Sequence, residues 1–137
     1  SALDIGLTQR DLLRFLTAMP RLYNADPDRT VLMGFSQGAA VAYATALRQP
    51  SVCRGIAGLV GFVPHVAPEA VAGRLTRLPV FMAVGEQDET VPPDESRRAA
   101  AVLRAAGAAL DYRAYPTGHK LTAAALDDLQ TWLASFP

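Results

Sequence analysis

Short runs of continuously hydrophobic residues alternate along the chain with longer amphipathic stretches. Residues 31–35, 55–62 and 78–85 are apolar at nearly every position. Runs of this length without polar alternation are typical of strands covered on both faces of a sheet. Residues 110–116 alternate apolar and polar side chains instead. That alternation predicts a half-exposed strand nearer the edge of the sheet.

The stretches beside the first strand have the spacing of amphipathic helices. Thr8 and Asp11 form a capping-box pattern and predict a helix over residues 8–19, which Pro20 should end or kink. A second helix should follow residue 36 and stop at Pro50. The apolar faces expected for these helices are Leu12, Leu13, Leu16 and Met19 in the first, and Ala40, Val41, Ala44 and Leu47 in the second.

Two further helices are predicted in the second half of the chain. One covers residues 94–106, and Gly107 is well placed to close it. The other ends the chain and presents Trp132 to the core. Their apolar stripes are Ala99, Val102, Leu103 and Ala106, and then Ala125, Leu129, Trp132, Leu133 and Phe136.

Strands separated by helices predict parallel pairing through right-handed crossovers. The fold class is therefore α/β, a three-layer sandwich with a mainly parallel sheet of about four strands and flanking helices. The 137 residues suit a single domain. In such sheets the chemistry collects in the loops at the carboxyl ends of the strands.

Composition narrows the function classes. The 13 basic residues balance the 13 acidic ones and form no dense basic run, which argues against a nucleic acid or an anionic membrane as the main partner. No apolar run is long enough for a membrane-spanning helix. Cys53 is the sole cysteine and is expected to be a small buried residue in a reducing compartment. We therefore expect a soluble, cytoplasmic protein.

The segment "VLMGFSQGAA" joins the first strand to the second helix through Gly34, Ser36 and Gly38, a G-x-S-x-G motif. In a nucleophile elbow the serine lies in a strained turn between strand and helix, where side chains two residues away would collide. The turn exposes the hydroxyl, and the N–H of Gln37 can face a developing oxyanion at the helix start.

A serine hydroxyl needs a base, and that base needs a carboxylate to orient it. His119, in "YPTGHKL", follows the last strand, whereas His65 precedes every candidate acid in "VGEQDETVP". That segment offers Asp88, and we expect its other carboxylates to be solvated: Glu86, Glu89 and, slightly later, Asp94. Two distant histidines and one cysteine lack metal-ligand spacing, and "GFSQG" lacks the lysine of a phosphate-binding loop. No metal or cofactor is therefore expected.

The segments "VLMGFSQGAAVA", "GEQDETVP" and the later "GH" resemble the α/β-hydrolase superfamily, and within it the carboxylesterase/phospholipase family that includes acyl-protein thioesterases. The resemblance implies Ser36 as nucleophile, Asp88 as the acid and His119 as the base, in the order expected of this fold. It implies cleavage of an ester or thioester through an acyl-enzyme. The residues after the strands, including Phe62, Val63, Val91 and Leu121, are expected either to line an apolar acyl pocket or to pack under the loops. His65 is expected at the pocket wall or surface.

The same resemblance implies that these residues are the carboxyl-terminal portion of a longer hydrolase. Members of the family have several strands before the first helix seen here, and a loop among them supplies the second oxyanion N–H. We therefore expect a preceding segment, or a second copy in a homo-oligomer, to cover the free edge of the strand at 31–35.

Other functions share these motifs. A dienelactone-hydrolase-like enzyme would act on a cyclic ester, although such enzymes usually carry cysteine where this chain has Ser36. A peptidase of the prolyl-oligopeptidase type has the same order of catalytic residues, but nothing in the sequence favours peptide substrates. A non-catalytic hydrolase fragment acting as a subunit or scaffold is the alternative from another class.

Overall fold

The computed structural model describes residues 2–23 and 25–137. In this part of the chain four strands form one sheet in the order β1-β2-β3-β4, and every neighbouring pair is parallel. The strands are β1 (Val31–Phe35), β2 (Gly55–Leu59), β3 (Pro79–Gly85) and β4 (Ala109–Tyr115). The four predicted strands and their parallel pairing are confirmed, except that β2 ends at Leu59 and not at residue 62, because Val60 has a positive φ and turns the chain into a loop.

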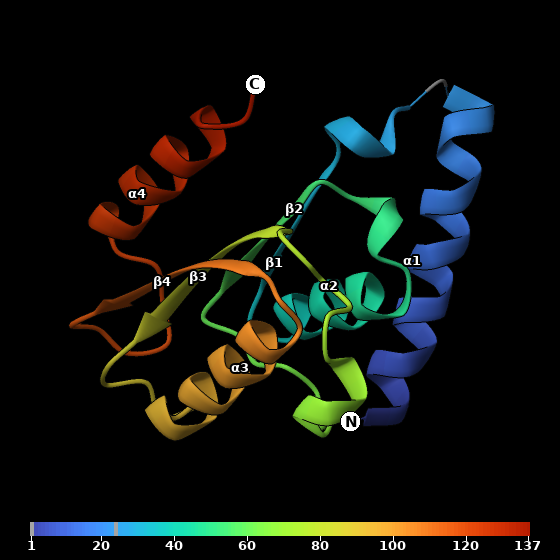
Figure 1. The fold of residues 1–137 in the computed structure, drawn as a ribbon. Helices are drawn as coiled ribbons and strands as arrows, with labels where there is room; N and C mark the ends of the chain where they lie inside the picture. Colours follow the sequence, from blue (N-terminus) through green and yellow to red (C-terminus); the bar gives the residue numbers. More distant parts are fainter. Residues whose placement is uncertain (1, 24) are drawn as a thin grey trace.

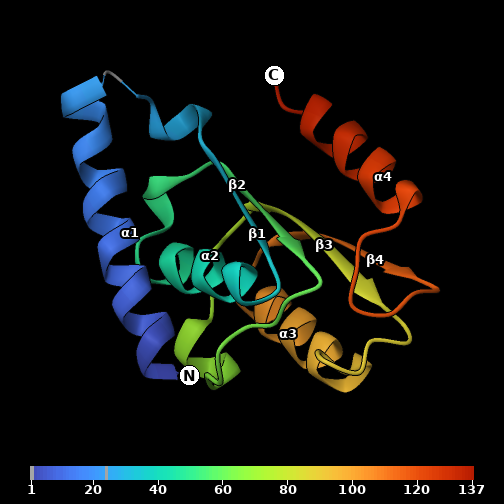
Figure 2. The same ribbon diagram turned by 180° about the vertical axis from the view of Figure 1, so that it is seen from behind.

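Helices cover both faces of the sheet, so the three-layer α/β sandwich is confirmed (Figures 1 and 2). α2 and α3 lie on one face, with α1 packed outside α2, and α4 lies on the other face. The helices are α1 (Ala2–Tyr23), α2 (Gln37–Arg48), α3 (Pro93–Ala105) and α4 (Ala123–Ala134), with short 3₁₀ turns at Pro27–Arg29, Pro50–Val52 and Pro68–Val71.

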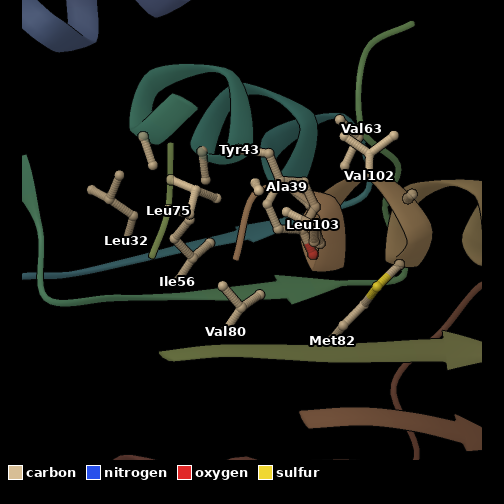
Figure 3. Packing of buried hydrophobic residues seen from close by; sticks show 14 of the residues in the cluster. Leu32, Ala39, Tyr43, Ile56, Val63, Leu75, Val80, Met82, Val102 and Leu103 are labelled. Carbon is tan, nitrogen blue, oxygen red and sulfur yellow. The ribbon is translucent and has the colours of Figure 1, made fainter. Parts of the chain in front are cut away.

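The larger hydrophobic core lies between the sheet and the α2–α3 layer. Tyr43 from α2 and Leu103 from α3 meet Ile56, Val80 and Met82 from the two central strands (Figure 3). On the opposite face a smaller core joins the sheet to α4. Alternate residues of β2 and β3 point into the two cores, which explains why these strands are apolar without alternation.

The first helix is longer than the predicted range of 8–19. It begins at Ala2, six residues before the expected cap at Thr8, and it continues past Pro20 to Tyr23. Ile5 is buried and lies three turns before the buried Leu16, so the apolar face already starts in front of Thr8. Proline removes only one helical hydrogen bond, and the helix ends within one turn after it.

The predicted face of α2 was only partly correct, since Ala40 is fully buried and Leu47 packs against the core. The helix buries Ala39, Ala40, Ala42, Tyr43, Thr45 and Ala46, whereas Val41, Ala44 and Leu47 are only half-buried. Val41 and Ile5 of α1 line the same hollow between the two helices. Because α2 is packed between the sheet and another helix, small residues line its deep side, and the larger aliphatic residues do not mark the sheet-facing side.

The predictions for the second half of the chain are largely confirmed. The stripe of α3 is buried, and Gly107 follows that helix with a φ of +86°. Trp132 packs on Phe81 with a ring-centroid distance of 5.8 Å. Phe136 lies beyond the end of α4, yet it meets Trp132 edge-on at 4.9 Å.

The edge strand β1 is covered on one face only by the described residues. Leu32 is buried under the α2 layer, but Met33 and Phe35 on the other face are 50% and 47% exposed. α4 covers the neighbouring strands and leaves this part of the sheet open. The expectation of a strand covered on both faces is therefore not met within residues 2–23 and 25–137.

In the parts of the chain that the structure describes, no helix combines the length and the hydropathy needed to cross a membrane. Cys53 is buried as expected, and burial raises the pKa of its thiol to about 11, although a backbone hydrogen bond from Gly55 offsets part of that effect.

The contact between β2 and α2 generates a test of the core. A methyl group on Gly58 would lie 1.6 Å from the hydroxyl oxygen of the fully buried Tyr43, so Gly58→Ala should lower the free energy of unfolding by roughly 1–3 kcal/mol. A methyl group on Gly6 of α1 would meet nothing within 4 Å. Gly6→Ala should therefore raise the free energy of unfolding by about 0.5–1 kcal/mol.

Denaturant unfolding of both variants measures these changes. Equal stability of the Gly58→Ala variant and the unmodified protein would contradict the packing described for Tyr43.

Candidate active site

The carboxyl ends of all four strands lie at one edge of the parallel sheet. Ser36 follows β1, the loop 60–66 follows β2, Asp88 lies in the loop after β3, and His119 lies in the loop after β4. Parallel pairing in register brings these four loops together although they are distant in sequence.

Ser36 occupies a sharp turn between β1 and α2. Its φ of 55° and ψ of −116° are rare for a residue with a side chain, and such strain is typical of functional turns. Its N–H donates to the carbonyl of Leu59 at 2.8 Å, and its carbonyl accepts from the N–H of Ala39 at 3.1 Å. These bonds hold the strained residue between the sheet and the first turn of the helix.

The two glycines of the motif are not equivalent. A Cβ on Gly34 would lie 2.3 Å from the backbone of Gly38, so this position must be glycine for the turn to close. A Cβ on Gly38 would meet nothing within 4 Å. The expected collision across the turn is therefore correct for Gly34 and wrong for Gly38, because Gly38 already lies in α2 and its hydrogens point into open space.

The side chains of Ser36, His119 and Asp88 form a continuous hydrogen-bonded chain. The Ser36 Oγ lies 2.9 Å from His119 Nε2, and His119 Nδ1 lies 2.8 Å from Asp88 Oδ2. A proton on Nδ1 donated to the carboxylate leaves Nε2 as an acceptor for the serine hydroxyl. The three residues named from the sequence are thus brought together in the order that general-base activation of a serine requires.

Asp88 is a buried carboxylate that accepts several hydrogen bonds. Its Oδ1 accepts from the backbone N–H groups of Thr90 and Val91, each at 2.8 Å. Burial by itself would raise the pKa of Asp88, but the bonds from Val91, His119 and Thr90 outweigh it and hold the pKa below its ordinary value. The carboxylate therefore remains ionised beside the imidazole.

The loops that carry the acid and the base are tied together through their backbones. The N–H of Glu86 donates to the carbonyl of Tyr115 at 2.9 Å, and the N–H of Gln87 donates to the carbonyl of Thr117 at 3.0 Å.

Asp88 is buried, whereas the other carboxylates of this region are exposed, as expected: Glu86, Glu89 and Asp94.

Gln37 is the first residue of α2 and directly follows Ser36. A backbone N–H at the first position of a helix has no intrahelical acceptor, so it is available to an anion. Gln37 also lines the cleft that opens at Ser36. Its N–H therefore fits a role as oxyanion donor.

The cleft beside Ser36 has a volume of about 460 Å³, which is in the range of small-molecule sites. Phe62 and Val91 line it as expected, and so does His65, whose side chain is exposed. Two expected pocket residues do not. Val63 is fully buried in the α2–α3 core because it points inward between Phe62 and His65, which face the cleft. Leu121 is half-buried and packs against the smaller core under α4.

Sequence reasoning missed two residues of the site. Phe35 ends β1, and its ring lies 5.4 Å from the His119 ring between centroids, so it packs against the imidazole. Its position directly before Ser36 was the signal that could have identified it. Glu95 lines the cleft from the first turn of α3, and only the packing of that helix brings it there.

The chain is similar in sequence to known carboxylesterases and thioesterases. A sequence model of the phospholipase/carboxylesterase family matches residues 11–136. An acyl-protein thioesterase 1 of Gibberella zeae is 35% identical over 115 residues, which cover 78% of this chain and 48% of that protein. A probable inactive carboxylesterase of Oryza sativa subsp. japonica is 27% identical over 134 residues, which cover 91% of this chain and 55% of that protein.

Among solved structures, the Bacillus cereus carboxylesterase superimposes with a TM-score of 0.84 at 23% identity, covering 98% of this chain and 62% of that chain. This likeness shows a shared α/β-hydrolase fold. The chain spans about half the length of the curated relatives it matches. Because the family model covers nearly all of its residues, the chain belongs to the phospholipase/carboxylesterase family of α/β hydrolases.

Proposed function

We propose that the protein is a serine hydrolase that cleaves carboxylic ester or thioester bonds of small-molecule or acyl substrates through an acyl-enzyme intermediate. The observation that carries the proposal is the hydrogen-bonded chain from Ser36 Oγ through the imidazole of His119 to the carboxylate of Asp88. The cleft at Ser36 supports it, because a substrate carbonyl needs room beside the nucleophile.

In the first half of the reaction, His119 Nε2 accepts the proton of the Ser36 hydroxyl as Oγ attacks the substrate carbonyl carbon. The carbonyl oxygen becomes an oxyanion, and the N–H of Gln37 and the positive end of α2 stabilise it. When the tetrahedral intermediate collapses, the bond to the alcohol or thiol breaks, and the leaving group takes the proton from His119.

In the second half, water attacks the acyl-enzyme while His119 accepts one of its protons, and the same proton returns to Ser36 Oγ as the acid leaves. Asp88 holds the imidazole in the orientation and tautomer that both steps need. Its ionised carboxylate also stabilises the imidazolium that forms transiently, since the pKa of Asp88 is held below its ordinary value.

The alternative function is a non-catalytic subunit or scaffold that retains the three residues. The relative from Oryza sativa, named as probably inactive, supports this alternative. Ester cleavage and a chemically reactive Ser36 are expected of the hydrolase and not of the scaffold. The expected cytoplasmic location stays a prediction.

We also propose that a preceding segment of a longer protein covers the open side of β1. The chain spans 48% and 55% of the two relatives described above, which leaves room for such a segment. Met33 and Phe35 are apolar and half-exposed on an edge strand that pairs on one side only within the described residues, and natural proteins protect edges of this kind. The same segment would supply the second oxyanion donor, whose loss typically lowers the rate by about a hundred to a thousandfold.

Ser36→Ala should abolish labelling by a fluorophosphonate probe and lower kcat for an aryl ester by at least about a thousandfold, because no other group provides the attacking oxygen. Ser51→Ala, at an exposed serine in the 3₁₀ turn after α2, is the matched control and should retain both. A folded protein in which the probe leaves Ser36 unmodified would favour the scaffold.

The rate of the acylation step, measured as kcat/KM, should fall as the pH is lowered from about 8 to about 5. Protonated imidazole cannot accept the Ser36 proton. Because the pKa of Asp88 lies below its ordinary value, Asp88 stays ionised over this range, and the fall therefore reports on His119. A flat profile, with the fold shown to be intact by circular dichroism, would exclude His119 as the base.

Hydrogen exchange in the full-length protein tests the coverage of β1. An edge strand leaves the outward-pointing amides unprotected, so pairing with a preceding segment should protect every amide of residues 31–35. Exchange that is slow only at alternate residues would contradict the proposal. Protection that disappears on dilution, together with a dimeric mass, would identify a second copy as the covering partner.

A further inference from the structure

The cleft beside Ser36 lies between two segments that are far apart in the sequence. The loop 60–66, which follows β2, contributes Phe62 and His65. The segment that leads into α3 contributes Thr90 and Val91, and the first turn of α3 contributes Glu95. The width of the cleft therefore depends on how the loop 60–66 is held relative to α3.

The loop 60–66 leaves the sheet in a constrained conformation. Val60, a β-branched residue, has a φ of +46°, and its N–H donates to the carbonyl of Ala83 at 2.8 Å. A Cβ on Gly61 would lie 2.7 Å from the carbonyl oxygen of Ser36, so the loop crosses directly against the nucleophile turn. This start of the loop is fixed by the sheet and the turn.

Farther along, the loop is held by one arginine from α3. Arg98 Nη2 donates to the carbonyl oxygen of Val63 at 2.7 Å. The same guanidinium donates to Glu95 Oε2 from Nη2 at 3.0 Å and from Nε at 3.3 Å. A guanidinium is rigid and planar, so its two bonds to Glu95 fix its orientation. The second N–H of Nη2 then points toward the carbonyl of Val63.

We propose that Arg98 is a positioning residue that sets the width of the substrate cleft, and thereby the size of the acyl or alcohol group that the proposed hydrolase accepts. Arg98 acts through the Val63 carbonyl, which lies between the two cleft residues of the loop, Phe62 and His65. Glu95 keeps the guanidinium in place and itself lines the opposite wall. The role of Arg98 in substrate size rests on the proposed function, whereas its role in holding the loop 60–66 can be tested without it.

The neighbouring residue offers a matched control. Arg97 forms an i,i+3 ion pair with Asp94, as Arg98 does with Glu95. The side chains of Arg97 and Asp94 are both exposed, and among the described residues neither hydrogen-bonds the loop 60–66. Arg97→Met removes the same charge from the same turn of α3 as Arg98→Met does. The two variants differ in the bond to the Val63 carbonyl and also in the carboxylate that each releases, since Glu95 lines the cleft and Asp94 does not. The exchange measurement on the loop separates these two differences.

The first measurement compares kcat and KM for aryl esters of increasing acyl length in the full-length protein. Arg98→Met should raise KM for the longer esters by about tenfold while kcat stays within about threefold, because a charge-assisted bond is lost and the triad is not touched. Arg98→Lys should restore part of the loss, since ammonium can still donate to Val63. The inference is overturned if Arg98→Met and Arg97→Met change KM equally.

The second measurement does not depend on catalysis. Hydrogen exchange at the amides of Gly61 and Val63, which are the buried residues of the loop, should be at least about tenfold faster in Arg98→Met than in Arg97→Met, with equal global stability in denaturant. Unchanged exchange would overturn the inference even in an active enzyme. Faster exchange in a protein whose Ser36 does not react with fluorophosphonate would uphold the positioning role and reject the proposed hydrolase.

Discussion

Parallel pairing of four strands is the constraint on which the rest of the structure depends. With all strands running in one direction and neighbouring strands hydrogen-bonded in register, their carboxyl ends meet at one edge. Every loop of the candidate site leaves the sheet there. Residues separated by 83 positions, Ser36 and His119, can approach to hydrogen-bonding distance because β1 and β4 end at this same edge. No local contact in the chain would bring them together.

The sheet alone does not place the side chains, and backbone contacts between loops complete the arrangement. The turn at Ser36 closes because Gly34 has no side chain to meet the backbone of α2. Asp88 remains ionised although it is buried, since two backbone N–H groups and an imidazole compensate the loss of water. The site is therefore held by groups whose positions depend on the fold, and its chemistry depends on their geometry as much as on residue type.

Several elements were predictable because their signals are local. The apolar runs predict the strands. The succession of strand, G-x-S-x-G motif and helix predicts the strained turn at Ser36 and makes this residue the candidate nucleophile. Burial faces were less predictable. The face of α2 was partly misassigned because a helix between a sheet and another helix is apolar on two sides, so its periodicity does not say which side faces the sheet. The start of α1 was missed because the capping pattern at Thr8 is also compatible with a helix interior.

By itself the sequence determined the fold class, the positions of the strands along the chain and the three residue types that can activate a serine, because hydrophobic period and motif spacing are properties of the local chain. Tertiary structure alone decided that Val63 and Leu121 pack against the two cores instead of lining the cleft, and that Phe35 and Glu95 belong to the site. These outcomes depend on contacts between segments distant in sequence, and side-chain direction in a loop follows from packing rather than from any repeating pattern.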